Sequence, residues 1–179
     1  MSQLFGPTRQ VGYVVRDIKR AMARWIGLGV GPWFCMEDVQ PTEFRYLGRP
    51  SRSPRFSMAA AHSGDLQLEL IQQLDDAPSL YLDTLERNGE CAQHVAYWTV
   101  DRYDEYCRHL LAQGCIEGHA GRMAPTRGPF AYFIHPDEPS LMIEVSELTG
   151  GKAEFNEMVR RASTGWDGGD AIRRIGVLR

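Results

Sequence analysis

The spacing of apolar positions along the chain predicts a strand, then a helix, then several strands, and this order occurs twice. Residues 10–15 (QVGYVV) are apolar and rich in β-branched side chains, as in a buried strand. Residues 16–29 follow with apolar side chains at helical spacing, and Asp17 is a suitable N-cap. Further apolar segments, parted by Pro, Gly and Ser, are typical of strands. These segments span residues 31–39, 42–48, 54–61 and 66–73.

The same order begins again near residue 94. Residues 94–100 (HVAYWTV) predict a strand, and residues 101–114 predict a helix with Asp101 as its N-cap. This restart predicts one domain over residues 1–148, built from two similar modules, and a helical extension over 149–179. Module 1 covers residues 8–73, a connector covers 74–92 and module 2 covers 93–148. The connector is predicted to contain a short helix near 78–87, and module 2 has further predicted strands over 115–123, 128–136 and 140–148. In the extension, a helix is predicted over 152–163.

Composition and charge remove several classes of protein. The net charge is −3 and no basic run occurs, which speaks against a nucleic-acid partner. The apolar runs are too short for a membrane span, and the first ten residues lack the features of a secretory signal. The four cysteines show no CxxC spacing, so we expect reduced thiols and a cytoplasmic protein.

Two glutamates interrupt apolar strand segments at matching places in the two modules. Glu69 lies in the last strand of module 1, and Glu144 lies in the last strand of module 2. Taken alone, each is typical of the solvated face of a half-buried strand. Gln10 and His94, however, begin the opening strands of the same two modules. If the modules pack as a pseudo-dimer, all four side chains converge, and their oxygen and nitrogen atoms suit a borderline divalent cation.

Several quoted segments resemble one known superfamily over about residues 8–148. They are VGYVVRDIKRAMARWIGLGVGPWF, LELIQQ, HVAYWTVD and FAYFIHPDEPSLMIEVSEL. Their order and spacing resemble the vicinal oxygen chelate superfamily, which includes glyoxalase I, methylmalonyl-CoA epimerase, extradiol dioxygenases and bleomycin-resistance proteins. The resemblance implies an α+β fold in which two tandem βαβββ modules form a cupped mixed sheet around a metal ion. Homodimers are common in this superfamily, so we expect one here.

The resemblance also implies roles for the four polar residues. The usual metal-ligand positions map onto Gln10, Glu69, His94 and Glu144, a set similar to that of one class of glyoxalase I. The implied cofactor is a divalent ion, with Zn, Ni, Co, Mn and Fe as the candidates. Glu144 is then the expected catalytic base, and Glu69 is a second catalytic carboxylate if an epimerisation needs two. One departure is that residues 55–60 (RFSMAA) carry no carboxylate where methylmalonyl-CoA epimerases have a further acidic residue.

The main functional hypothesis is a metal-dependent isomerase, epimerase or lyase that stabilises an enolate-like intermediate. Its substrate would be small, apolar or aromatic and oxygenated, with acyl-CoA thioesters included. The alternatives are a metal-free antibiotic-binding protein and an extradiol-type dioxygenase. Because both acidic positions, Glu69 and Glu144, are present, the enzyme is favoured over the binding protein. Gln10 stands where a dioxygenase would have a histidine, which speaks against the dioxygenase.

Aromatic and sulfur-containing side chains supply candidate walls for the substrate cavity. Strand alternation places a share of them on the opposite face of the sheet. His109 and His119 have no ligand partner at a suitable spacing, so we expect both at the surface. The predicted substrate-binding residues are Trp33, Tyr46, Phe56, Met58, Trp98, Phe130 and Tyr132.

Overall fold

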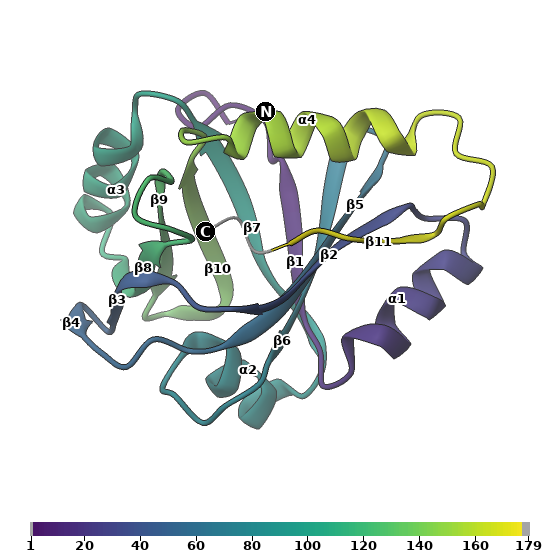
Figure 1. The fold of residues 1–179 in the computed structure, drawn as a ribbon. Coiled ribbons are helices and arrows are strands. Elements are labelled where there is room, and N and C mark those ends of the chain that lie inside the picture. Colours follow the sequence, from purple (N-terminus) through teal and green to yellow (C-terminus); the bar gives the residue numbers. More distant parts are fainter. Residues whose placement is uncertain (1, 177–179) are drawn as a thin grey trace.

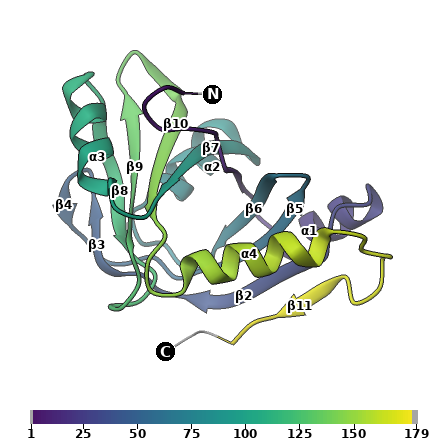
Figure 2. The ribbon, with the colours of Figure 1, turned by 90° about the horizontal axis from the view of Figure 1, so that it is seen from above.

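A curved, unclosed sheet organises residues 2–176, the part of the chain that the computed structural model describes (Figures 1 and 2). Within these residues the sheet has eleven strands and is accompanied by four helices. The strands are β1 (Gln10–Val14), β2 (Trp33–Val39), β3 (Thr42–Tyr46), β4 (Arg49–Pro50), β5 (Phe56–Ser63), β6 (Leu66–Gln73), β7 (Cys91–Thr99), β8 (Ile116–Arg122), β9 (Pro129–His135), β10 (Glu138–Glu147) and β11 (Ile172–Arg174). The helices are α1 (Ile18–Gly27), α2 (Leu80–Asn88), α3 (Tyr103–Ala112) and α4 (Lys152–Ser163).

The strand order confirms the predicted duplication. The first half contributes the neighbours β2-β5-β6-β1, and the second half contributes β7-β10-β9-β8. In each half the opening strand lies parallel to the last one, β1 to β6 and β7 to β10. The two opening strands, β1 and β7, then pair antiparallel and join the halves into one mixed sheet.

The register between the halves defines which residues correspond. Gln10 lies opposite Ala96, and Gly12 lies opposite His94. A two-fold rotation that exchanges the halves therefore moves Gln10 onto the place of His94 and Gly12 onto the place of Ala96. Gln10 in the first half therefore corresponds to His94 in the second. The parallel pairings agree, because Glu69 lies opposite Gly12 just as Glu144 lies opposite Ala96.

Three additional strands extend the sheet beyond the eight strands of the repeat. The segment predicted over 42–48 is a strand, but β3 pairs with β8 of the second half, and β4 pairs with β3. At the other end, β11 from the C-terminal segment runs parallel to β2. Each half thus has its outer strand covered, which removes a long row of unpaired backbone groups from the edge. The sequence did not predict β11.

Alternation along the strands separates an outer face from an inner one. On the first half, α1 packs on the outer face against the side chains of Trp33, Ala59 and Leu70. On the second half, α3 packs on the outer face around Phe133 and Val145. The inner faces of both halves are turned toward each other, and α4 lies across this side of the sheet (Figure 2).

The helix ends bear out most of the predicted boundaries. The Asp17 side chain accepts a hydrogen bond from the Arg20 backbone N–H at 2.9 Å, as an N-cap does. The prediction for Asp101 was wrong. At α3 the N-cap residue is Arg102, and the Thr99 hydroxyl accepts from the backbone N–H groups of Asp101 and Arg102 instead. Helix α4 spans the predicted residues. Among residues 2–176, no helix has both the length and the apolar character needed to cross a membrane.

Candidate metal centre and its cavity

Three ionisable side chains from both halves meet on the inner face of the sheet. Glu69 on β6, His94 on β7 and Glu144 on β10 place one potential ligand atom each within 4.8 Å of the others. Nε2 of His94 lies 3.3 Å from Oε2 of Glu144 and 3.5 Å from Oε2 of Glu69. All three residues are buried, with exposed fractions of 7%, 2% and 7% for Glu69, His94 and Glu144. The two glutamates therefore do not face solvent, as an isolated alternating glutamate usually would.

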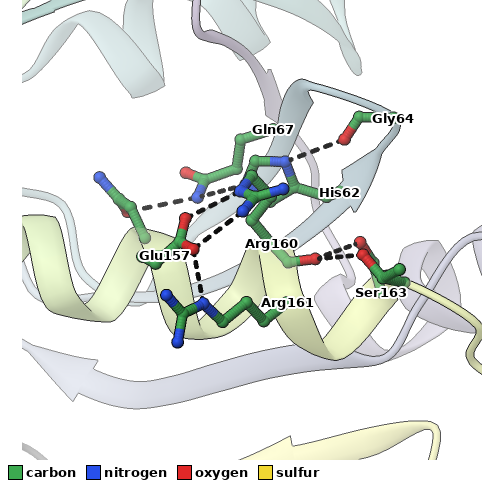
Figure 3. A network of polar contacts seen from close by, with 9 residues as sticks. His62, Gly64, Gln67, Glu157, Arg160, Arg161 and Ser163 are labelled. Atoms are coloured by element: carbon green, nitrogen blue, oxygen red, sulfur yellow. Dashed lines mark hydrogen bonds and ion pairs between the residues drawn. The ribbon is translucent and has the colours of Figure 1, made fainter.

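Gln10 lies on β1, between the strands that carry Glu69 and His94, and lines the same cavity as both glutamates. Its Nε2 donates to Oε1 of Gln67 at 2.7 Å, which leaves the amide oxygen as the atom available to a cation. Gln67 is held in turn, because its Nε2 donates to Oδ1 of Asn156 on α4 at 3.2 Å and lies 3.4 Å from Nε2 of His62 (Figure 3). A hydrogen-bonded chain thus connects α4 to Gln10.

A second chain of hydrogen bonds orients His94 from the other side. Nε2 of Gln93 donates to the backbone oxygen of Leu80 and to the hydroxyl of Thr84, both at 2.8 Å. The Gln93 oxygen must then face Nδ1 of His94, 3.2 Å away, and accept its hydrogen. With the proton on Nδ1, the neutral ring presents a lone pair on Nε2, as a metal-ligating histidine does.

The cluster fits a divalent cation. Nε2 of His94 is buried and has no hydrogen-bond partner among the described residues, although it lies between two carboxylates. An unsatisfied buried nitrogen is costly, and a cation shared with the two carboxylates would satisfy all three groups. The donor set of one nitrogen, two carboxylates and an amide oxygen suits the ions expected from the sequence.

Burial and mutual charge shift the pKa values of the cluster. Burial, reinforced by the charge of Glu144, raises the pKa of Glu69. For Glu144, burial acts upward but is outweighed by His94 and by Lys152, so its pKa is lowered. Burial alone would lower the pKa of His94, and the two carboxylates reverse this and raise it to about 9. Without a cation, the two carboxylates therefore favour the protonated, positively charged form of the His94 ring.

An apolar cavity of about 110 Å³ opens onto this cluster. Of the predicted wall residues, Phe56, Met58, Trp98, Phe130 and Tyr132 line it. Gln67, unlike these, was missed, although it shares a face with Glu69 through the two-residue period of β6. The other lining residues, none of which is among the predicted substrate-binding residues, are Met36, Val39, Ile71, Tyr81, Met123, Arg127, Ser146, Lys152, Phe155 and Asn156.

The structure corrects the placement of two predicted wall residues. Trp33 is fully buried on the outer face with the α1 cluster, because alternation along β2 places it on the face opposite Phe34 and the cavity residue Met36. Tyr46, on β3, is directed toward α2, where its hydroxyl donates to Oδ2 of Asp83 at 2.7 Å. Neither side chain lines the cavity.

The prediction that His119 lies at the surface was wrong. Its exposed fraction is 0%, and its ring contacts Tyr132 and Tyr81 at centroid distances of 4.2 Å and 4.8 Å. Phe44 of β3 covers it from the side, and this pairing between halves could not be inferred from spacing. Burial, with a smaller contribution from the charge of His94, lowers the pKa of His119 to about 3.

The duplicated cup and its buried cluster define a βαβββ-repeat protein with an internal metal-type site. A family model described as the Glyoxalase/Bleomycin resistance protein/Dioxygenase superfamily matches residues 9–133. The chain therefore belongs to this superfamily, as the sequence resemblance implied.

Solved structures agree with this assignment at the level of the fold. Methylmalonyl-CoA epimerase from Mycobacterium tuberculosis has a TM-score of 0.56 and 22% sequence identity, over 86% of this chain and 95% of that one. A Streptomyces coelicolor methylmalonyl-CoA epimerase variant in complex with 2-nitronate-propionyl-CoA has a TM-score of 0.51 and 16% identity, over 79% and 93%. No curated protein matches the sequence significantly.

Proposed function

We propose that this protein is a divalent-metal-dependent isomerase, epimerase or lyase that removes a proton next to a carbonyl group of a small oxygenated substrate. The observation that supports the proposal is the convergence of Glu69, His94 and Glu144 beside an apolar cavity that Gln10 and the two glutamates line. Buried carboxylates of this kind are costly without a cation, and an open cavity beside them leaves space for a ligand.

Gln10, Glu69, His94 and Glu144 would hold the cation. A divalent ion in this position supplies Lewis acidity that stabilises negative charge developing on a carbonyl oxygen. Glu144 is our candidate for the base that accepts the proton, because its carboxylate lines the cavity beside the aromatic wall. Glu69 approaches the same cavity from the other half, so it would act on the opposite face of the substrate carbon if the reaction is an epimerisation.

The cavity walls narrow the choice of substrate. Phe56 and Met58 face the cavity from β5, so this wall carries no carboxylate, and it packs against apolar or aromatic substrate atoms instead. Acyl-CoA thioesters are among the candidates. Support for them comes from fold neighbours solved with 2-nitronate-propionyl-CoA and with methylmalonyl-CoA.

Metal content is the decisive test of this proposal. Purified protein is reconstituted separately with Zn, Ni, Co, Mn and Fe, desalted and examined by elemental analysis. We expect about one equivalent of at least one ion per chain, lost in His94→Ala and kept in His109→Ala, which alters an exposed histidine. Wild-type protein that retains no ion would instead favour the metal-free binding protein.

A further inference from the structure

Two cationic side chains lie at the α4 end of the cavity. Lys152 is in the first turn of α4, Arg127 lies in the loop before β9, and both line the cavity. Among residues 2–176, neither forms an ion pair. Farther along the same helix, Arg160 and Arg161 both pair with Glu157 (Figure 3). The two cations that line the cavity are thus without an ion pair, whereas Arg160 and Arg161 on the solvent-facing part of α4 are paired.

The charged end of Lys152 is turned inward. Its Nζ donates to the hydroxyl of Ser146 at 2.6 Å and lies 3.3 Å and 3.5 Å from the backbone oxygens of Gly128 and Pro129. Ser146 is only 4% exposed, and it follows Glu144 by two residues on β10. Two residues advance a strand by roughly 7 Å, so Ser146 and Glu144 project from the same face of β10 and the ammonium group lies on the cluster's side of the sheet.

Close backbone packing fixes this end of the cavity. A Cβ at Gly150 would lie 2.1 Å from the backbone oxygen of Thr126, and one at Gly128 would lie 2.3 Å from that of Glu147. Only glycine allows the two chain segments to approach so closely. Arg127 and Lys152 therefore lie on two chain segments, around residues 126–128 and 147–152, that pack tightly against each other.

The arrangement is electrostatically unfavourable in the absence of an anion. A lysine in the first turn of a helix opposes the helix dipole. Burial, partly offset by Glu144, lowers the pKa of Lys152 to about 8, and the charge of Arg127 contributes to the lowering. At neutral pH Lys152 is still mainly cationic. A divalent ion would neutralise Glu69 and Glu144, and the two cations would then have no counter-charge in the cavity.

We propose that Lys152 and Arg127 form an anion-binding subsite for a substrate that carries a carboxylate. The carboxylate lies on the α4 side of the cavity, beside Lys152 and Arg127, while the carbonyl end of the substrate faces Glu69 and Glu144. This inference rests on the proposed function for the cluster end and specifies the substrate class.

Two probes that share one metal-binding group test the subsite. Acetohydroxamate supplies the chelating group alone, and N-hydroxymalonamate adds a carboxylate to the same group. Binding to the metal-loaded protein is followed by calorimetry and by the fluorescence of Trp98, which lines the cavity. We expect wild-type protein to bind N-hydroxymalonamate about tenfold or more tightly than acetohydroxamate, the range for a charge-assisted hydrogen bond.

Matched variants separate this role from a structural one. Lys152→Met keeps the apolar stem and should abolish the preference between the probes, with acetohydroxamate affinity changed less than about threefold. Arg127→Met should reduce the preference. Arg161→Met removes the same charge from an exposed position on α4 and should keep it. Equal binding of both probes to wild-type protein would overturn the subsite, and so would a full preference in Lys152→Met.

Failure of the metal site gives a different result. If no protein retains an ion and neither hydroxamate binds, the proposed function fails. The subsite needs the ion to neutralise Glu69 and Glu144, so it then fails together with the proposed function. Retained metal and bound acetohydroxamate, with no preference between the two probes, overturn the subsite alone.

Discussion

Gly12 lies directly across the junction between the halves from His94, and a Cβ at Gly12 would stand 1.8 Å from Cε1 of the His94 ring. The missing side chain on β1 thus provides the space into which the imidazole of β7 extends. The His94 ring can reach the two carboxylates only because the opposite residue is glycine. The equivalent position in the second half, Ala96, lies opposite Gln10.

We therefore expect Gly12→Ala to displace the His94 ring. Overpacking should lower the free energy of unfolding by about 1–3 kcal/mol, and metal retention should be lost. The matched control is Gly27→Ala at the end of α1, where a new Cβ meets nothing within 4 Å and helix propensity favours alanine. Denaturant unfolding and elemental analysis measure the two effects. A Gly12→Ala protein with unchanged metal content would show that the ring does not need this space.

Gln93 is expected to influence metal affinity without touching the ion. Gln93→Met removes the acceptor for Nδ1 of His94, so the ring loses its fixed tautomer and orientation, and metal affinity should fall about 10–100-fold. Competition with a fluorescent chelator measures the affinity. Gln113→Met, at an exposed position, is the control and should bind metal as the wild type does. Equal affinities for both variants would refute the orienting role.

Glu144→Gln separates metal binding from proton transfer. The amide keeps an oxygen ligand but cannot accept a proton, so the ion should be retained with reduced affinity while proton exchange falls by at least about 10²-fold. Exchange is measured by NMR in D₂O at the α-carbon of a substrate that the wild type exchanges, with methylmalonyl-CoA as the first probe. Full exchange activity in Glu144→Gln would remove this residue as the base.

His119 should make stability depend on pH in the acidic range. Its pKa is about 3 in the folded protein, against an ordinary value of 6.5, so between these limits the unfolded chain binds a proton that the folded chain does not. Stability contributed by the neutral ring is complete above pH 6.5 and is lost as the pH falls toward 3, at up to about 1.4 kcal/mol per pH unit.

The variant that checks this effect is His119→Leu, which is similar in volume. Both ring nitrogens of His119 are buried without partners, so the variant should be equally or more stable at pH 7, by about 1 kcal/mol. Its stability should also fall less between pH 6.5 and 4 than that of the wild type. Parallel curves for the two proteins in urea unfolding would contradict the assignment.

The sequence predicted what depends on local period and on the repeat. Matching places in the two modules are occupied by Gln10 and His94 and by Glu69 and Glu144. Because the strands that carry these residues pair side by side in the sheet, the side chains come close together. Such pairing is encoded by alternation, which is visible in the chain. The residues themselves were expected as ligands only through the superfamily resemblance.

What could not be predicted depends on contacts between distant segments. Trp33 and Phe34 are adjacent large side chains on β2, and only the packing of α1 shows which one faces outward. His119 is buried because β3 crosses to the other half, and no spacing indicates this. Lys152 enters the cavity because α4 folds back over it, a placement that follows from neither propensity nor period.

The strands β3 and β11 make the repeat indivisible. A polypeptide cut within residues 74–90 would give two pieces, each of which carries the outermost strand that the other piece requires. Separately expressed fragments should remain unfolded or aggregate, and they should recover native structure only by complementing each other. A protein assembled from two similar units thus behaves as one cooperative unit, in which neither copy can be deleted or replaced alone.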